Sequence, residues 1–400
     1  MMTSGSSESA ETILSRFLQQ TEHAKGEINK SLSAPDQVTN DPQCVEAPEI
    51  PHVEPPRVED PNLETAQSCG KNRDYLEEAL SQVSPTFTQP RDASSTGVPS
   101  QCVSYVMSHY NNDALKGHAG NLARCRTPGG YPSRGNFKPC VTGQYVNVVA
   151  NTFADVSSCL GLPAKDIIPQ IFQESNFEID ALGVNYDAGI GQLTAPAIDA
   201  VNTDPNLGLE YFKQQAASST SRACKNIAPY VEQYQATVPG THRTNADLSA
   251  RCEFISAPDN PLKNLFYLAI FYKQNFATAQ RLFDAYDISM TLKRSGFSSA
   301  QVEKLEEMSA ILGYNAGGGT AVILLKNYLD SRPRGKKLTI ADFEIPSQGA
   351  RQLPGSFSQY LLWHQSSGSR GYLNGISDKA RILNHEFKAG TCASDPFLSL

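Results

Sequence analysis

The sequence predicts that Glu174 lies on a helix, beside an apolar surface. At 100° per residue, Ile167, Ile168 and Ile171 fall on one helical face, and Glu174 falls at the edge of that face. Apolar surroundings disfavour the charged form of a carboxyl group, so we expect the pKa of Glu174 to rise from ~4.3 toward ~6. A carboxylic acid that stays protonated near neutral pH is the proton donor that glycosidic-bond cleavage needs. The alternative is an ordinary solvated glutamate at the end of a helix.

The elements that must position this carboxyl group read as helices. Pro169 either kinks the helix that carries Glu174 or starts a shorter helix at its own first turn. The pattern predicts a long, aromatic-rich helix over 261–286, which has a proline at its first turn, and a capping box at 298–301 predicts the start of another helix. From residue 161 onward there is no sustained alternation of the kind that strands show. We therefore expect an all-α fold, or an α+β fold in which helices dominate.

Five short motifs follow one another in this part of the chain. They are E-S-N-F at 174–177, G-I-G-Q at 189–192, N-P-L-K-N-L at 260–265, Y-N-A-G at 314–317 and R-G-Y-L at 370–373. In this order they resemble motifs of the soluble-type lytic transglycosylases and the goose-type lysozymes. The resemblance covers roughly residues 140–390 and implies a mainly α, α+β lysozyme-like domain with a substrate cleft.

The resemblance implies a role for Glu174 as general acid and base on bacterial peptidoglycan. The matching residue of the family donates a proton to the oxygen between N-acetylmuramic acid and N-acetylglucosamine. In the transglycosylases it then takes the proton of the muramyl C6 hydroxyl, which attacks C1 and leaves a 1,6-anhydro end. One carboxyl group suffices because this nucleophile is intramolecular. Tyr314 would place its hydroxyl group on the Glu174 carboxylate and fix its orientation.

The same resemblance gives supporting roles to residues of the other motifs. Gly189 and Gln192 would line the cleft and hold the sugar at the cleavage point. Ser175 would have a positional role, because no His or Asp lies at a spacing that suggests a catalytic triad. Asn315 would either bind substrate or hold its loop. Tyr372 would either line the cleft opposite Glu174 or be a core tyrosine with a satisfied hydroxyl group.

The chain also departs from the family pattern. Gly191 stands where a methionine is usual, which predicts a smaller and more flexible cleft wall, and Gly313 replaces the usual alanine. Goose-type lysozymes hold a water with additional aspartates, and one such position falls on Thr194. Asp180 and Asp187 lie in the loop before the G-I-G-Q motif, and a second carboxylate there would favour hydrolysis. We therefore expect a lytic transglycosylase, with a hydrolytic muramidase as the alternative.

The composition divides the chain into three parts. Residues 1–99 are acidic and proline-rich, and we expect a largely disordered tether that is able to carry a protein partner. Residues 100–160 read as a cysteine-rich helical segment packed on the catalytic domain, which we place at 161–392. Within that domain, 203–257 is longer than the family's linking region. We interpret it as a disulfide-closed insertion that roofs the cleft or binds a partner.

The nine cysteines favour an oxidising compartment, with up to four disulfides and one remaining thiol. The cysteines at 102, 125, 140 and 159 would staple the loop at 127–138, and a zinc site that includes His109 and His118 is the less favoured alternative. We expect no metal and no organic cofactor. Residues 1–20 lack the pattern of a signal peptide, so a periplasmic or secreted location implies a processed chain or another export route.

The charge and the apolar pattern exclude other classes of function. The formal net charge is -7, and no basic stripe interleaved with aromatic residues suggests nucleic acid as a partner. No apolar stretch reaches the ~20 residues that a membrane span needs. Two alternatives from other classes stay open: a non-catalytic wall-binding protein of the same fold, and a secretion-associated protein that docks a partner through 1–99.

Overall fold

The computed structural model describes residues 85–91, 98, 100–108, 143–179, 181, 187–234, 254, 260–333, 337–346, 351, 353–365 and 369–394. All of the described residues belong to one unit of the chain, Glu59–Leu400.

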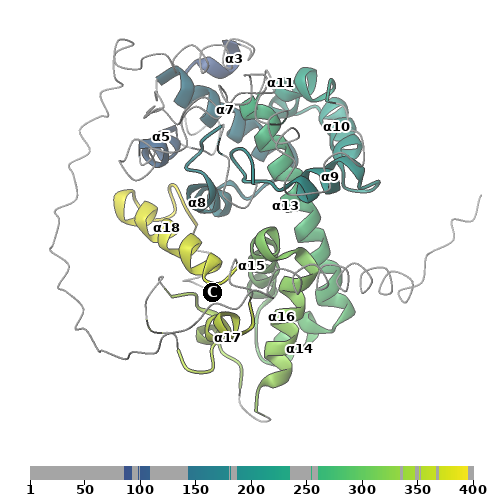
Figure 1. Ribbon diagram of the computed structural model, residues 1–400, viewed down its shortest axis with the longest axis vertical. Coiled ribbons are helices and arrows are strands. Elements are labelled where there is room, and N and C mark those ends of the chain that lie inside the picture. The colour runs from purple at the N-terminus through teal and green to yellow at the C-terminus, as the bar shows by residue number, and fades with distance from the viewer. Residues whose placement is uncertain are drawn as a thin grey trace, which may run out of the picture. The chain divides into compact units, whose positions relative to one another are not determined.

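Helices make up most of the described residues (Figure 1). They are α3 (Pro85–Thr88), α5 (Ser100–Ser108), α7 (Gly143–Leu160), α8 (Ala164–Glu174), α9 (Ala195–Thr203), α10 (Leu209–Ser218), α11 (Arg222–Val231), α13 (Asn260–Ala285), α14 (Ile288–Arg294), α15 (Ser299–Ala316), α16 (Gly318–Ser331), the 3-10 helix η3 (Ile340–Phe343), α17 (Phe357–His364) and α18 (Tyr372–Glu386). Extended pairing among these residues is limited to one antiparallel bridge, Ala188 to Leu193. The prediction of a mainly α protein is confirmed for the described residues.

Helix α13 is the element on which the core is built. It corresponds to the predicted helix 261–286 and packs against α7, α15 and α16 (Figure 1). Its side chains at Leu265, Phe266, Leu268 and Ile270 are fully buried or nearly so. A helix that is apolar around most of its circumference has to lie inside the fold, and the neighbouring helices cover it.

The predicted start of α15 is confirmed, and the end of that helix is set by glycines. The Ser298 hydroxyl accepts from the Gln301 backbone N–H at 3.2 Å, and the Gln301 side chain accepts from the Ser298 N–H at 2.9 Å. Gly317 ends α15 with φ 86°, a conformation that favours glycine. At Gly313 a Cβ atom would lie 2.7 Å from the Cα of Gly318, so the close approach of α15 and α16 requires a residue without a side chain.

The folded body begins before residue 99. Phe87, on α3, is fully buried in the same core as the later helices. Arg91 makes hydrogen bonds to both carboxylate oxygens of Asp155 on α7, at 2.8 and 2.9 Å. The expected boundary of the tether at 99 is therefore wrong at its C-terminal end, because the buried Phe87 ring and the Arg91–Asp155 ion pair tie 85–91 to α7. The rest of 1–99, apart from Val98, lies outside the described residues.

Two disulfides join segments that are distant in the sequence. Cys102 on α5 bonds to Cys392 near the C-terminus, and Cys159 at the end of α7 bonds to Cys224 on α11. The expected staple of the 127–138 loop is therefore wrong for Cys102 and Cys159. The insertion 203–257 is likewise closed onto α7 through Cys224, and not within itself. The remaining cysteines, Cys44, Cys69, Cys125, Cys140 and Cys252, lie outside the described residues.

None of the described helices combines the length and the apolar character that crossing a membrane would demand.

Candidate active site around Glu174

Helix α8 ends at Glu174, and most of the residues that precede Glu174 in this helix are buried. The helix contains Pro169, which has no N–H to donate to the carbonyl oxygen of Lys165 one turn earlier. That oxygen accepts instead from the backbone N–H of Ser394 at 3.2 Å. The proline thus neither breaks the helix nor starts a new one, because a distant segment satisfies the freed acceptor.

The chain turns sharply after Glu174. The backbone N–H groups of Ser175 and Asn176 both donate to the carbonyl oxygen of Ile171, at 2.9 and 3.0 Å. Asn176 and Phe177 have φ angles of 55° and 63°, in the left-handed region that non-glycine residues rarely adopt. Phe177 is fully buried and packs edge-on against Phe153 at 5.7 Å. This packing holds a strained turn, and such turns occur preferentially at functional sites.

Two side chains hold the Glu174 carboxyl group in a hydrogen-bonded chain. The Tyr372 hydroxyl donates to Oε1 of Glu174 at 2.5 Å. The Gln170 amide, one turn earlier on α8, donates to the Tyr372 oxygen at 3.2 Å. Tyr372 is the first residue of α18, which packs along α8 (Figure 1). The docking of α18 on α8 therefore fixes the orientation of the carboxyl group.

The environment of Glu174 favours the neutral carboxylic acid. Burial raises the pKa of Glu174 to about 8; the negative charge of Asp187 adds to the rise, and the hydrogen bond from Tyr372 opposes it. The residue nevertheless keeps partial exposure to solvent. The predicted upward shift is thus present and exceeds the expected value of ~6. At pH 7 this site holds a proton on a group that solvent can still reach.

The loop that carries the G-I-G-Q motif is anchored to the end of α8. The Ser175 hydroxyl donates to the carbonyl oxygen of Ile190 at 2.6 Å. The Ile190 N–H donates to the Asn264 side chain at 2.9 Å, and a Cβ at Gly189 would lie 1.5 Å from that same amide oxygen. Gly189 also has φ 72°. The Ser175 hydroxyl thus ties this loop to the end of α8, and Gly189 is required for the close approach of the loop to α13.

Gln192 has a structural role in this loop. Its amide nitrogen donates to the carbonyl oxygens of Gly189 at 2.9 Å and Ala181 at 3.3 Å. Its backbone has φ 48°, so the loop reverses direction there. The residue is partly exposed, and these bonds leave its carbonyl oxygen as the group that can contact a ligand.

The structure corrects the contact expected for Tyr314. Its hydroxyl group donates to the carbonyl oxygen of Gly191 at 2.6 Å, and the contact with the carboxyl group belongs to Tyr372. Tyr314 is nonetheless close to the site, because the charges of Glu174 and Asp187 add to the rise in its pKa that burial causes. Tyr314 thus holds the loop that carries the G-I-G-Q motif, and Tyr372 holds the carboxyl group of Glu174.

The structure also corrects the expectation of a more flexible cleft wall at Gly191. The residue is buried, and a Cβ there would lie 2.6 Å from the Tyr314 hydroxyl oxygen and 2.9 Å from Cδ1 of Leu268. Tyr314 and Leu268 therefore already occupy the space that a side chain at position 191 would need.

The remaining candidate residues differ in their exposure and in their relation to Glu174. Asn315, near the end of α15, is exposed, which leaves it available to a ligand. Asp187 is partly buried and influences the pKa values of both Glu174 and Tyr314. Asp180 lies outside the described residues. Gln170 was missed by the sequence analysis, although its position four residues before Glu174 puts both side chains on one helical face.

Replacing Tyr372 by phenylalanine is expected to slow a reaction that uses Glu174 as its acid about 10- to 100-fold, because a hydrogen bond to an ionisable group contributes roughly 1.5–3 kcal/mol. The pKa of Glu174 should also rise further, since this hydrogen bond lowers it. A pH–rate profile measures both effects. Tyr267→Phe is the matched control, because that buried tyrosine donates at 2.8 Å to Asn202 and not to Glu174. Equal profiles for Tyr372→Phe and wild type would remove Tyr372 from the site.

The described residues contain no group of three or more His, Cys, Asp and Glu side chains that could hold a metal ion. The zinc alternative includes His109 and His118, which lie outside the described residues. Comparison of the chain with protein families, with curated proteins and with solved structures found no match. The case for a function therefore rests on the motif resemblance and on the chemistry of the site around Glu174.

Proposed function

We propose that the protein cleaves the glycan strands of peptidoglycan between N-acetylmuramic acid and N-acetylglucosamine, with Glu174 as the single general acid and base. The observation that carries the proposal is a carboxyl group whose pKa is raised to about 8 by burial and whose Oε1 is held by the Tyr372 hydroxyl at 2.5 Å. The motif resemblance supplies the substrate, and the geometry supplies a group suited to the reaction. The fold class that goes with this proposal is α+β lysozyme-like.

The proposed reaction uses Glu174 twice. The neutral acid donates its proton to the glycosidic oxygen as the bond to C1 breaks. The resulting carboxylate accepts the proton of the muramyl C6 hydroxyl, whose oxygen bonds to C1 and forms the 1,6-anhydro ring. Tyr372 donates to the carboxyl oxygen throughout and stabilises the charged form that exists between the two steps. Exposed Asn315 and the partly exposed Gln192 are the residues that we assign to sugar binding.

Hydrolysis by a muramidase is a second candidate, and one observation favours it. The negative charge of Asp187 is near enough to Glu174 to raise its pKa. A second carboxylate beside the acid is able to activate a water molecule, whereas a transglycosylase needs none.

The products distinguish the two reactions. Purified sacculi are digested with the full-length protein and the fragments are analysed by mass spectrometry. The transglycosylase proposal predicts 1,6-anhydromuramyl ends, and the muramidase predicts reducing ends that are one water heavier. Sacculi that release no fragments would support the non-catalytic wall-binding alternative.

Activity is expected to stay on a plateau up to pH 7 and to fall about tenfold per pH unit above pH 8. The reason is that the acid must be protonated when substrate binds, and its folded-state pKa is about 8. The initial rate of sacculus digestion between pH 4 and pH 10 measures this limb. A plateau that ends near pH 5 would show a solvated carboxyl group and would contradict the assigned role.

The two disulfides support a periplasmic or secreted location as part of the proposal. Cys102–Cys392 and Cys159–Cys224 each join segments that are far apart in the sequence, and such bonds persist in oxidising compartments. Peptidoglycan is found in the same compartments. A protein partner for residues 1–99 remains a hypothesis that the described residues do not address.

A further inference from the structure

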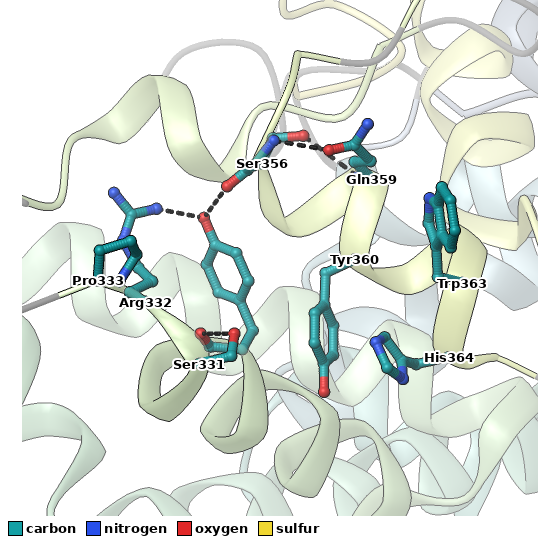
Figure 2. A pocket seen from close by; sticks show the side chains of 10 residues that line it. Ser331, Arg332, Pro333, Ser356, Gln359, Tyr360, Trp363 and His364 are labelled. Carbon is teal, nitrogen blue, oxygen red and sulfur yellow. Dashed lines mark hydrogen bonds between the residues drawn. The ribbon is translucent and has the colours of Figure 1, made fainter.

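A pocket of about 380 Å³ lies between the end of α16 and helix α17, and it shares no residue with the Glu174 site (Figure 2). The residues that line it are Tyr328, Ser331, Arg332, Pro333, Gly355, Ser356, Gln359, Tyr360, Trp363 and His364. Its volume falls within the range of ~300–1,000 Å³ that small-ligand pockets occupy.

Aromatic rings dominate one side of the pocket. Trp363 is 76% exposed, the largest exposed fraction of any large hydrophobic residue that the structure describes. The rings of Tyr360 and His364 stack at 4.0 Å with an interplanar angle of 24°. Figure 2 shows Tyr360, His364 and Trp363 together on one side of the pocket, with Arg332 on the other side. An exposed indole beside further rings is a flat apolar surface that water covers at a cost in free energy.

The opposite side of the pocket offers hydrogen bonds without net charge. The Arg332 side chain is 7% exposed, and its terminal nitrogens donate to Asp342 at 2.9 and 3.2 Å and to the Tyr328 hydroxyl at 2.6 Å. Its Nε is buried and has no hydrogen-bond partner among the described residues. The ion pair with Asp342 neutralises the guanidinium group, so the pocket does not select an anion.

We propose that this pocket binds a neutral saccharide. A pyranose ring presents an apolar face of C–H groups that fits a flat aromatic side chain, and a rim of hydroxyl groups that accept and donate hydrogen bonds. Trp363 and Tyr360 provide the flat surface, and the partly exposed Gln359 side chain provides polar groups at the rim. The saccharide class follows from this pocket alone. Its identity as an outlying part of the peptidoglycan strand rests on the proposed function.

The only tryptophan of the chain makes this proposal directly measurable. Excitation at wavelengths that only tryptophan absorbs reports on Trp363 and on no other position. Full-length Glu174→Gln protein, which should not cleave the probe, is titrated with a hexamer of β-1,4-linked N-acetylglucosamine. We expect a saturable change in emission, and no such change with inorganic phosphate or with a proline decapeptide.

Variants assign the signal to the pocket. Tyr360→Ala should weaken the apparent Kd for the hexamer at least about 10-fold, as truncation of an aromatic anchor usually does. His364→Ala, at an exposed position, provides the same test if Tyr360→Ala fails to fold. Tyr211→Ala is the matched control, because this tyrosine is 38% exposed on α10 and does not line the pocket.

The outcomes separate this inference from the proposed function. An unchanged emission with millimolar hexamer, or equal binding by the control and both pocket variants, would overturn the saccharide site. A response to phosphate or to the proline peptide in place of the hexamer would overturn it as well. Saturable binding that Tyr360→Ala or His364→Ala weakens would support the site even if sacculi are left uncleaved, which would count against the proposed function alone.

Discussion

Glu174→Gln is expected to lower turnover on purified peptidoglycan by at least about 10²–10⁴, the usual contribution of general acid/base catalysis. The amide has the size and shape of the carboxyl group and can still accept from the Tyr372 hydroxyl, but it has no proton to give to a glycosidic oxygen. Clearing of a cell-wall suspension, followed with time at pH 6, measures the loss. The proposal fails if the variant clears the suspension as fast as the wild type.

The matched control is Glu307→Gln. Glu307 is another partly buried glutamate whose pKa is raised by burial, but it is paired with Lys304 at 2.7 Å. Loss of activity in Glu174→Gln alone would show that the effect comes from this site and not from the loss of a partly buried acid in general.

Thermal unfolding of Glu174→Gln provides an independent control for folding. The folded-state pKa of Glu174 is raised from 4.5 to about 8, so the unfolded chain gives up this proton at lower pH than the folded protein does. Below pH 4.5 Glu174 therefore does not lower the free energy of unfolding. Between pH 4.5 and pH 8 it lowers this free energy by an increasing amount, and above pH 8 its effect is complete. The Tm of the variant minus the Tm of the wild type should therefore be larger at pH 9 than at pH 4. An inactive variant that is less stable at both pH values would point to misfolding.

The parts of the molecule that could be predicted from the sequence are those in which the determining contacts are local. The capping box of Ser298 and Gln301 spans three residues, and the long helix α13 follows from its own apolar pattern and from Pro261. The position of Glu174 at the edge of an apolar face likewise needs only the helical period. Each of these depends on spacing within one or a few turns, which the sequence contains directly.

Long-range contacts decide the features that the sequence analysis missed. Tyr314 and Tyr372 both lie in motifs of the resemblance, and nothing local tells which hydroxyl group reaches the acid. Tyr372 is 198 residues from Glu174, and it contacts the carboxyl group because α18 docks on α8. The disulfide partner of Cys102 is 290 residues away. Such choices depend on how the helices pack together, and spacing in a single sequence carries no record of that packing.

Gly191→Ala is expected to destabilise the protein by about 1–3 kcal/mol, the usual effect of overpacking a filled interior. The new Cβ would lie 2.6 Å from the Tyr314 hydroxyl oxygen and 2.9 Å from Cδ1 of Leu268, and neither atom belongs to an exposed side chain that could move away. Gly191 is not among the glycines with positive φ, so the cost comes from the collision and not from the backbone. Urea denaturation followed by circular dichroism measures the change in the free energy of unfolding.

A double-mutant cycle with Tyr314→Phe identifies the collision partner. Tyr314→Phe alone loses the hydrogen bond to the Gly191 carbonyl oxygen, but it also removes the atom nearest to the new Cβ. The double variant should therefore be less destabilised than the sum of the two single variants. Gly296→Ala is the control, because Gly296 has φ 97° and nothing within 4 Å of its Cβ position, so its cost is conformational and Tyr314→Phe should add to it fully. If the losses in the free energy of unfolding for Gly191→Ala and Tyr314→Phe are additive, Tyr314 does not hold the loop that carries the G-I-G-Q motif.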